Sequence, residues 1–297
     1  MRLADDLFAG VELGGTKCIA LLARGPEDII EREQVPTTSP AETLTSLSHI
    51  LSAWRSKPGF AALGIGSFGP LDLDPASRTF GRITSTPKPG WAGAEVLERL
   101  GGAADVPTAI DTDVNGAALA EMHWGAGRGM SDFAYITVGT GVGVGLIING
   151  RPTRGFAHCE LGHIRVARLA SDEFPGSCPF HGDCVEGLAA GPSLKARTGT
   201  GGALQFASDD QTWDSVASAL AQLCHVIVCA AAPRAIAVGG GVIEGNPHLL
   251  ERINSMLVES LNGYMELPAG DPYVRAPGLG ANAGPLGAIA LAMSAKR

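Results

Sequence analysis

Two cysteines and two histidines in the middle of the chain have the spacing of a metal site. Cys178, His181 and Cys184 follow one another at intervals of three residues, so one loop can present three soft ligands to a single ion. His163 lies 15 residues before Cys178 and can complete the set. Four nitrogen and sulfur ligands with no open position are typical of structural zinc. The alternative is a pair of unrelated thiols beside a surface histidine. The other histidines have no further potential metal ligands at suitable spacing and are interpreted as structural: His49, His123, His158, His225 and His248.

A second polar cluster, Asp111-Thr112-Asp113-Val114-Asn115, is predicted at the end of a strand and the start of a helix. One aspartate there needs no role beyond capping the helix. Two aspartates and an asparagine within five residues exceed what a single cap requires. A carboxylate within reach of a substrate hydroxyl can accept its proton while the oxygen attacks a phosphoryl group. The cluster is therefore a candidate for general-base catalysis.

Three glycine-rich turns could hold a nucleotide. Gly14-Gly15-Thr16-Lys17 and Gly139-Thr140-Gly141 combine glycines, which admit a phosphate close to the backbone, with amide and hydroxyl donors. Each alone can be an ordinary turn, but two of them at the starts of similar halves favour one polyphosphate held between them. Gly239-Gly240-Gly241 can admit adenine or ribose, or be a tight strand-to-helix turn. Neither the Walker motif nor the dinucleotide-binding GxGxxG motif occurs between a predicted strand and a predicted helix, as each motif requires. This argues against the P-loop and the Rossmann folds.

Composition sets the class of protein. The chain has 297 residues, 45% hydrophobic and 18% charged, which allows two domains and excludes disorder. The net charge of −8 without a basic patch argues against a nucleic-acid partner. Asp5 and Asp6 stand where a secretion signal needs basic residues, and Val216–Pro233 is interpreted as a core helix and not a membrane span. We expect a cytoplasmic protein with no membrane partner, whose six cysteines form no disulfide framework.

The elements that must position these groups alternate between strands and helices. A capping box with proline at the first helical position, Ser39-Pro40-Ala41-Glu42, predicts a helix to about Arg55. Strands are predicted at Phe8–Leu13, Lys17–Ala23, Ile29–Pro36, Ala61–Ser67, Thr108–Asp111, Ala134–Val138, Val142–Ile148, Ala235–Val238 and Tyr273–Val274. Further helices are predicted at Asp113 to about His123, near Leu188–Arg197, at Val216–Ala231, at Pro247–Leu261 and from about Pro285.

The two halves of the chain begin alike, with a strand, a Gly/Thr turn and a second strand. This weak internal repeat predicts two similar α/β domains with a cleft between them. We place them at residues 1–133, with the first phosphate turn and the aspartates, and at residues 134–297, with the second turn and the Cys/His loop. The C-terminal helix is free to pack back on the first domain.

The combination of motifs resembles, over essentially the full length, the ROK family of sugar kinases, which have the actin-like (hexokinase/Hsp70-type) ATPase fold. Within the family the chain is most similar to the bacterial fructokinase group, through Cys178–Cys184 and Thr86-Pro87-Lys88-Pro89-Gly90-Trp91. Many ROK members have a more cysteine-rich zinc loop. The motifs that carry the family resemblance are the two phosphate turns, Asp111–Asn115, Glu160-Leu161-Gly162-His163 and the run from Cys178 to Pro192.

The resemblance implies a role for each motif. Asp113 is the expected general base. The residues expected at the sugar are Gly69, Asn115, Glu160, His163 and Glu186. The expected zinc ligands are His163, Cys178, His181 and Cys184, so His163 would use one ring nitrogen for the metal and the other for the sugar. The residues expected at the nucleotide are Gly14, Gly15, Thr16, Lys17, Thr140, Gly141, Gly240 and Gly241.

The implied activity is phosphorylation of a hexose by Mg·ATP, with fructose to fructose 6-phosphate expected and structural Zn²⁺ as a further cofactor. Mannose, glucose or an N-acetylhexosamine remain alternative acceptors. A regulatory protein of the same family would need an N-terminal DNA-binding module, whereas seven residues precede Phe8, and a non-catalytic sugar sensor would not need Asp113. A homodimer is compatible with the resemblance. One position departs from it: Glu12 stands where actin-like kinases commonly have the aspartate that helps hold the magnesium shell.

Overall fold

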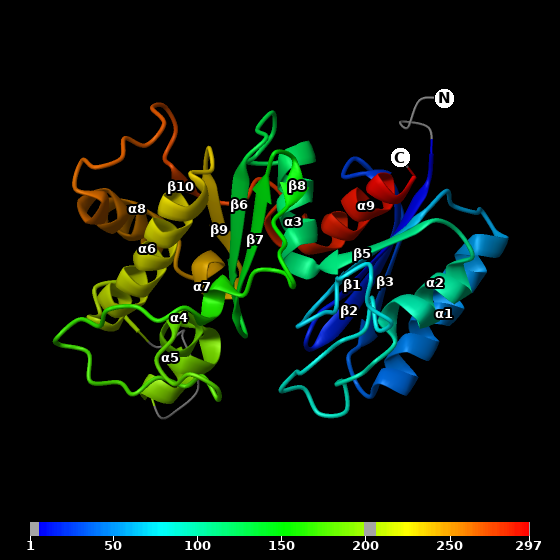
Figure 1. Cartoon of the computed structure of the whole chain (residues 1–297), viewed down its shortest axis with the longest axis horizontal. Coiled ribbons are helices and arrows are strands. Elements are labelled where there is room, and N and C mark those ends of the chain that lie inside the picture. Colours follow the sequence, from blue (N-terminus) through cyan, green and yellow to red (C-terminus); the bar gives the residue numbers. More distant parts are fainter. Residues whose placement is uncertain (1–5, 199–205, 297) are drawn as a thin grey trace. The chain divides into compact units, whose positions relative to one another are not determined.

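The computed structural model of the chain describes residues 6–198 and 206–296 and divides them into two compact units (Figure 1). Unit 1 comprises residues 6–128, 153–158 and 281–296. Unit 2 comprises residues 129–152 and the described part of 159–280. The second unit therefore begins at Gly129, five residues before the predicted start at Ala134, and two later segments return to unit 1.

Unit 1 is built on a mixed five-stranded sheet. The antiparallel strands β1 (Phe8–Leu13), β2 (Lys17–Gly25) and β3 (Asp28–Pro36) follow one another along the chain. Next to β1 come β4 (Leu63–Ser67) and β5 (Thr108–Thr112), both parallel to it, so the order is β3-β2-β1-β4-β5. The first glycine turn, Gly14–Lys17, and Asp113 both follow carboxyl ends of strands in this sheet.

Helices cover both faces of this sheet, because successive residues of a strand point to opposite faces and both faces are apolar. The odd-numbered Ala9, Val11 and Leu13 belong to the hydrophobic core that also contains side chains of α1 (Pro40–Ser56) and α2 (Val96–Ala104). On the opposite face lies α9 at the C-terminus, which also packs on α3. These helices span Asp113–Trp124 (α3) and Ala283–Ala295 (α9).

Glycines let α9 approach the sheet and α3 at backbone distance. A Cβ on Gly10 would lie 2.9 Å from the Cβ of Ala288, and one on Gly64 would overlap the Ala288 carbonyl. A Cβ on Gly116 would lie 3.2 Å from the carbonyl carbon of Gly287. The C-terminal helix is therefore part of the core of unit 1, which the sequence left as one of two arrangements.

Unit 2 repeats the sheet of unit 1. Strands β6 (Phe133–Val138), β7 (Val142–Ile148) and β8 (Arg151–Pro152) are antiparallel neighbours. On the other side of β6 lie β9 (Ile236–Gly239) and β10 (Val274–Arg275), both parallel to the strand beside them. The order β8-β7-β6-β9-β10 matches β3-β2-β1-β4-β5 strand for strand.

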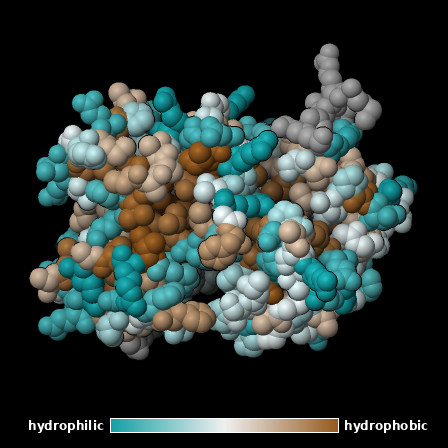
Figure 2. Space-filling view, viewed as in Figure 1, coloured by the Kyte–Doolittle hydropathy of each residue, from teal (hydrophilic) through white to brown (hydrophobic). Residues whose placement is uncertain are grey.

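The helices of unit 2 surround a hydrophobic core. Helix α6 (Thr212–Ala231) packs against α8 (His248–Leu261) and α4 (Val185–Ala189). Among the described residues, α6 alone is long and apolar enough to cross a membrane, and half of its apolar window is buried within the protein, as in a core helix. Hydrophobic surface is visible on unit 2 in the region where Figure 1 places α6 and α7 (Gly241–Glu244) (Figure 2).

The helices differ from the prediction at several places. Helix α2 was not predicted, because Gly101 and Gly102 lower the helical propensity of its second half. The helix predicted near Leu188–Arg197 is divided into α4 and α5 (Gly191–Thr198), with Ala190 extended between them. Helix α6 begins at Thr212, four residues before its predicted start.

Candidate active site

The four predicted zinc ligands converge in unit 2. Their ligand atoms all lie within 4.8 Å of one another. The His163 Nδ1 atom is 3.7 Å from Cys178 Sγ and 3.6 Å from Cys184 Sγ, and His181 Nδ1 is 3.7 Å from Cys178 Sγ. Tetrahedral zinc, with bonds of about 2.3 Å to sulfur and 2.0–2.1 Å to nitrogen, places sulfur and nitrogen about 3.6 Å apart. The donor set and its spacing therefore fit zinc.

The backbone around this cluster is folded tightly enough to need glycine. Cys178 and Gly182 exchange backbone hydrogen bonds of 3.1 and 2.9 Å. A Cβ on Gly176 or Gly187 would overlap the Gly182 carbonyl. Burial raises the pKa of the Cys184 thiol to about 11. These features hold two buried sulfurs at short range, an arrangement that a bound cation stabilises.

One histidine of this cluster, His163, also faces a carboxylate. While Nδ1 of His163 lies beside the two sulfurs, its Nε2 atom is 4.0 Å from Oε1 of Glu186. His163 forms the last residue of η2 (Leu161–His163), a short 3₁₀ helix that begins just after Glu160. Glu160 is exposed and Glu186 lies in the first turn of α4. The structure thus brings His163 and Glu186 together and places Glu160 three residues away along the chain.

Glu186 also contacts the second glycine turn. Its Oε2 atom accepts a hydrogen bond of 3.1 Å from the backbone amide of Val142, at the start of β7. A Cβ on Gly141 would lie 2.6 Å from the same oxygen, so the approach of Glu186 requires glycine there. Gly139 is bound to α5 through a 2.7 Å hydrogen bond from the Gly191 amide. The turn, with exposed Thr140, is therefore joined directly to the elements that follow the zinc loop.

The third glycine cluster closes over the end of β6. Gly240 has φ of +89°, and a Cβ there would lie 2.6 Å from the Val138 carbonyl oxygen. Gly240 thus belongs at the same edge of the sheet as Thr140. A Cβ on Gly241 would meet no atom of the described residues within 4 Å. Gly241 is therefore open where its side chain would project.

In unit 1 the first glycine turn joins β1 to β2. The amide of Gly14 donates to the Lys17 carbonyl over 3.1 Å, and a Cβ on Gly14 would lie 2.6 Å from that oxygen. Gly15, Thr16 and Lys17 are exposed. The Lys88 ammonium donates to the Gly15 carbonyl over 2.5 Å. Lys88, which is not among the residues predicted to bind the nucleotide, thus places a positive charge at this turn.

The aspartate cluster of unit 1 separates into two different environments. Asp111 is 1% exposed, and its Oδ1 accepts hydrogen bonds of 2.8 Å from both the Thr112 amide and Asn115 Nδ2. Its Oδ2 pairs with Arg154. Asp113 is the first residue of α3 and is half-buried. Of the two carboxylates, that of Asp113 is the more accessible.

Glu12 stands close to Asp113. Burial, together with the negative charge of Asp113, raises the pKa of Glu12 from 4.5 to about 7. Lys17 and Arg32 act in the opposite direction. The Glu12 carboxylate lies against Gly284 at the start of α9, where a Cβ would overlap its Oε1.

Two contacts at this site carry no sequence motif. Arg154 pairs with Asp111, and His158 Nε2 accepts a 3.0 Å hydrogen bond from the Leu71 amide, two residues after Gly69. His158 was interpreted as structural. Arg154 and His158 belong to no sequence motif, and each contacts a residue more than 40 positions away in the chain. Sequence spacing therefore could not predict either contact.

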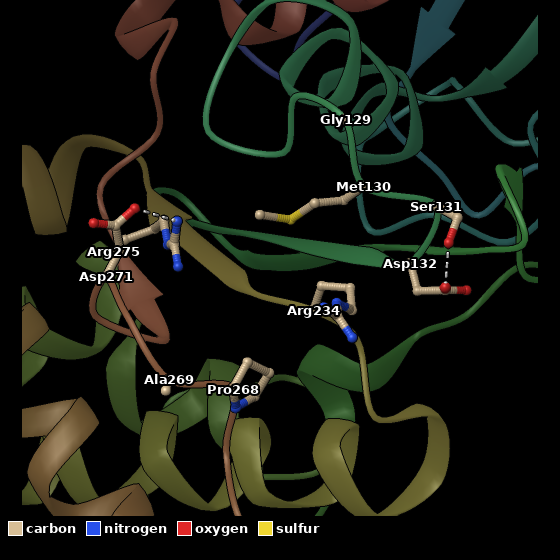
Figure 3. Close-up of a pocket in the computed structure, with 9 residues that line it drawn as sticks. All are labelled: Gly129, Met130, Ser131, Asp132, Arg234, Pro268, Ala269, Asp271 and Arg275. Atoms are coloured by element: carbon tan, nitrogen blue, oxygen red, sulfur yellow. Dashed lines mark hydrogen bonds and ion pairs between the residues drawn. The ribbon is translucent and has the colours of Figure 1, made fainter.

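A hollow of about 540 Å³ in unit 2 is lined by none of the predicted residues (Figure 3). It lies at the amino ends of β6, β9 and β10, whereas ligands of open α/β sheets bind beyond the carboxyl ends. Its two arginines are balanced by two aspartates, and Arg275 turns toward Asp271 in Figure 3. Its lining residues are Gly129, Met130, Ser131, Asp132, Arg234, Pro268, Ala269, Asp271 and Arg275.

Two α/β units with sheets of the same order define the actin-like ATPase fold found in hexokinases. The profile of the ROK family matches residues 8–295. The chain belongs to the ROK family.

Individual relatives cover the chain almost completely. The fructokinase of Zymomonas mobilis is 40% identical over 300 residues, covering 100% of this chain and 99% of its own. The fructokinase of Lactococcus lactis subsp. cremoris is 40% identical over 91% of both chains. Among solved structures, a ROK family glucokinase from Streptomyces griseus, in complex with glucose and AMPPNP, has a TM-score of 0.75 and 25% identity, with 97% of this chain and 99% of that chain covered.

Proposed function

We propose that the protein is an ATP-dependent fructokinase that transfers the γ-phosphoryl group of Mg·ATP to the 6-hydroxyl of D-fructose. The observation that carries the proposal is the 40% identity to the Zymomonas mobilis fructokinase across the whole of both chains. Relatives named fructokinase recur at 37–40% identity, whereas those named glucokinase share 27–30%.

Asp113 is the proposed general base. Its neighbour Asp111 is engaged by Arg154, Thr112 and Asn115 and is only 1% exposed, so its carboxylate is not accessible to a substrate. The half-buried Asp113 carboxylate would accept the proton of the sugar hydroxyl while that oxygen attacks phosphorus. The side chains proposed to bind sugar hydroxyls are Asn115, Glu160, His163 and Glu186. Gly69 is proposed to line the sugar site.

The glycine turns are proposed to hold the nucleotide. Exposed backbone amides in Gly14–Lys17 and Gly139–Gly141 are suited to phosphate oxygens, and Lys88 adds a positive charge beside the first turn. Gly240 and Gly241 would take the adenosine. AMPPNP is an analogue of ATP, and its presence in the glucokinase from Streptomyces griseus supports ATP as the phosphoryl donor. Magnesium bound to the phosphates would neutralise charge on the transferred group.

Zinc is proposed as a structural ion held by His163, Cys178, His181 and Cys184. Bound there, it would fix the loop geometry and leave the chemistry to the side chains. Because one nitrogen of His163 faces the sulfurs and the other faces Glu186, the ion would hold the ring in the orientation that a sugar hydroxyl needs.

A cytoplasmic location agrees with this proposal. No disulfide joins the six cysteines, all of which lie within the described residues, and disulfides are rare in reducing compartments. ATP and free hexoses also occur together there.

A coupled assay of ADP release over a panel of hexoses tests the proposal. Fructose should show the highest kcat/KM, with mannose second. If glucose or N-acetylmannosamine exceeded fructose by tenfold, about 1.4 kcal/mol in transition-state binding, fructose would be the wrong substrate while the kinase activity stood. Absence of ADP release with every hexose would overturn the kinase itself.

A further inference from the structure

A five-residue hairpin with no assigned role contacts two sugar-side elements of unit 1. Residues Arg154 and His158 pair as an antiparallel bridge, and the Gly155 amide donates to the Ala157 carbonyl over 3.0 Å. The hairpin follows β8 and precedes Cys159 and Glu160 along the chain, yet it packs as part of unit 1. It presents one side chain from each of its ends to that unit.

The first contact is the ion pair of Arg154 with Asp111. The Asp111 carboxylate is 1% exposed, whereas one third of the Arg154 side chain remains accessible. A buried carboxylate without a cation is unfavourable, because its charge is removed from water without compensation. Arg154 therefore supplies the positive partner that a carboxylate buried at this position requires.

Asp111 in turn fixes Asn115. Its Oδ1 accepts 2.8 Å hydrogen bonds from Asn115 Nδ2 and from the Thr112 amide. Asn115 is itself 3% exposed. With one N–H of Nδ2 bound to Asp111, the amide group of Asn115 is held in one orientation, and its oxygen and second N–H are left for other partners.

The second contact is made by His158. Its Nε2 accepts a 3.0 Å hydrogen bond from the Leu71 amide, and the imidazole is 8% exposed. A Cβ added to Gly69 would lie 3.4 Å from the same ring. The loop from Gly69 to Leu71 is therefore packed directly on the far end of the hairpin.

We propose that the Arg154–His158 hairpin is the positioning element of the sugar side of unit 1. Arg154 acts through Asp111 on the orientation of Asn115, and His158 fixes the loop at Gly69. Neither side chain needs to touch the substrate. The inference rests on the proposed function, because Asn115 and Gly69 are assigned to the sugar there. Small displacements of groups that orient a substrate reduce catalysis strongly.

The test measures steady-state kinetics of Arg154→Gln with fructose and with Mg·ATP. We expect the fructose KM to rise at least tenfold and the Mg·ATP KM to change less than twofold. Arg154→Lys keeps a positive charge and should recover part of the fructose affinity. Arg151→Gln, which removes the same charge from an exposed site three residues earlier, is the matched control and should behave as wild type.

Two double variants separate positioning from a general loss of structure. Asp111→Asn with Arg154→Gln removes both charges but keeps an acceptor for Asn115, so the fructose KM should return to within about threefold of wild type. This variant also keeps the test valid if Arg154→Gln folds poorly. In an Asn115→Ala background, Arg154→Gln should raise the fructose KM no further, because the group it orients is gone.

The proposal is overturned if Arg154→Gln leaves the fructose KM unchanged, or if both KM values rise together with a fall in Tm. Additive effects of Asn115→Ala and Arg154→Gln would equally overturn it. If Asn115→Ala alone leaves the fructose KM unchanged, the hairpin has no sugar contact to position. The wild-type hexose panel decides the proposed function independently of these variants.

Discussion

At the scale of single residues, Asp111 and Asp113 differ in environment although only Thr112 separates them. Asp111 is enclosed by Arg154 and two hydrogen-bond donors, whereas Asp113 begins α3 and stays accessible. The sequence reasoning predicted that this cluster exceeds a helix cap, but composition alone cannot say which carboxylate is enclosed. The cation that decides this, Arg154, comes from 43 positions away in the chain.

Asp113→Asn should abolish most of the activity. The substitution keeps the shape of the side chain and removes the proton acceptor. We expect kcat to fall by roughly 10²–10⁴-fold, the range for loss of a general base, with the affinity for Mg·ATP and the Tm close to wild type. Steady-state kinetics and thermal unfolding measure these quantities. A variant that retained more than a tenth of the wild-type kcat would remove Asp113 from this role.

Glu12 makes the stability of the protein depend on pH. Burial, then the charge of Asp113, raises its pKa in the folded protein from 4.5 to about 7. Between these values the folded chain keeps a proton that the unfolded chain has released. The stability from this group is therefore complete below about pH 4.5 and is lost as the pH rises through about 7.

Glu12→Gln should remove this dependence. From the size of the pKa change, the free energy of unfolding of the wild type should fall on the order of 2–3 kcal/mol between pH 5 and pH 8 because of Glu12 alone. Gln cannot ionise, so the variant should lack that part of the fall. Denaturant unfolding at both pH values, without nucleotide or magnesium, measures the difference. Identical pH dependence in the two proteins would show that the Glu12 carboxyl is not perturbed.

At the scale of elements, we expect the proposed zinc loop, Cys178–Cys184, together with α4 to affect sugar binding more than ATP binding. Cys184→Ser should lose the zinc and raise the fructose KM about ten- to a hundredfold, because His163 and Glu186 lose their anchor. Since Glu186 also bonds the Val142 amide beside the second turn, the Mg·ATP KM should rise as well, by about two- to threefold. Elemental analysis and kinetics measure both effects.

Cys229→Ser is the matched control for the zinc loop, because Cys229 is an exposed thiol outside the cluster. It should keep about one zinc per chain and wild-type kinetics. Full fructose affinity in zinc-free Cys184→Ser would contradict the structural role of the metal. Equal losses of fructose and ATP affinity would instead indicate general unfolding.

Elements with a local signal could be predicted from the sequence. Ser39 caps α1 as expected: its Oγ accepts from the Glu42 amide over 3.3 Å and donates to the Glu42 carboxylate over 3.0 Å. Helix α2 lacks such a signal, since no side chain caps its start. The Cys/His cluster could be predicted because three of its four members share one loop. The hairpin at Arg154 and His158 depends on tertiary partners that periodicity and spacing do not report.

At the scale of the whole molecule, the units are not contiguous in sequence, because unit 1 contains segments from both ends of the chain. Both units have sheets with the same strand order, but only unit 1 takes its last helix from the opposite end of the sequence. At Gly10 and Gly64, α9 occupies the space that a side chain would need. Unit 1 therefore depends on residues synthesised after all of unit 2.

Deletion of residues 281–297 should unfold unit 1 and leave unit 2 folded. Helix α9 buries Leu286, Ile289 and Leu291, each at most 4% exposed. Burial of such side chains contributes roughly 1.5–3 kcal/mol each, a sum comparable with the whole stability of a typical domain, about 5–15 kcal/mol. Hydrogen exchange should lose its protection in β1 and β4 and keep it in β6 and β9, while bound zinc is retained. If β1 and β4 remained protected, α9 would not be part of the core, and if all four strands exchanged together, the two units would unfold as one.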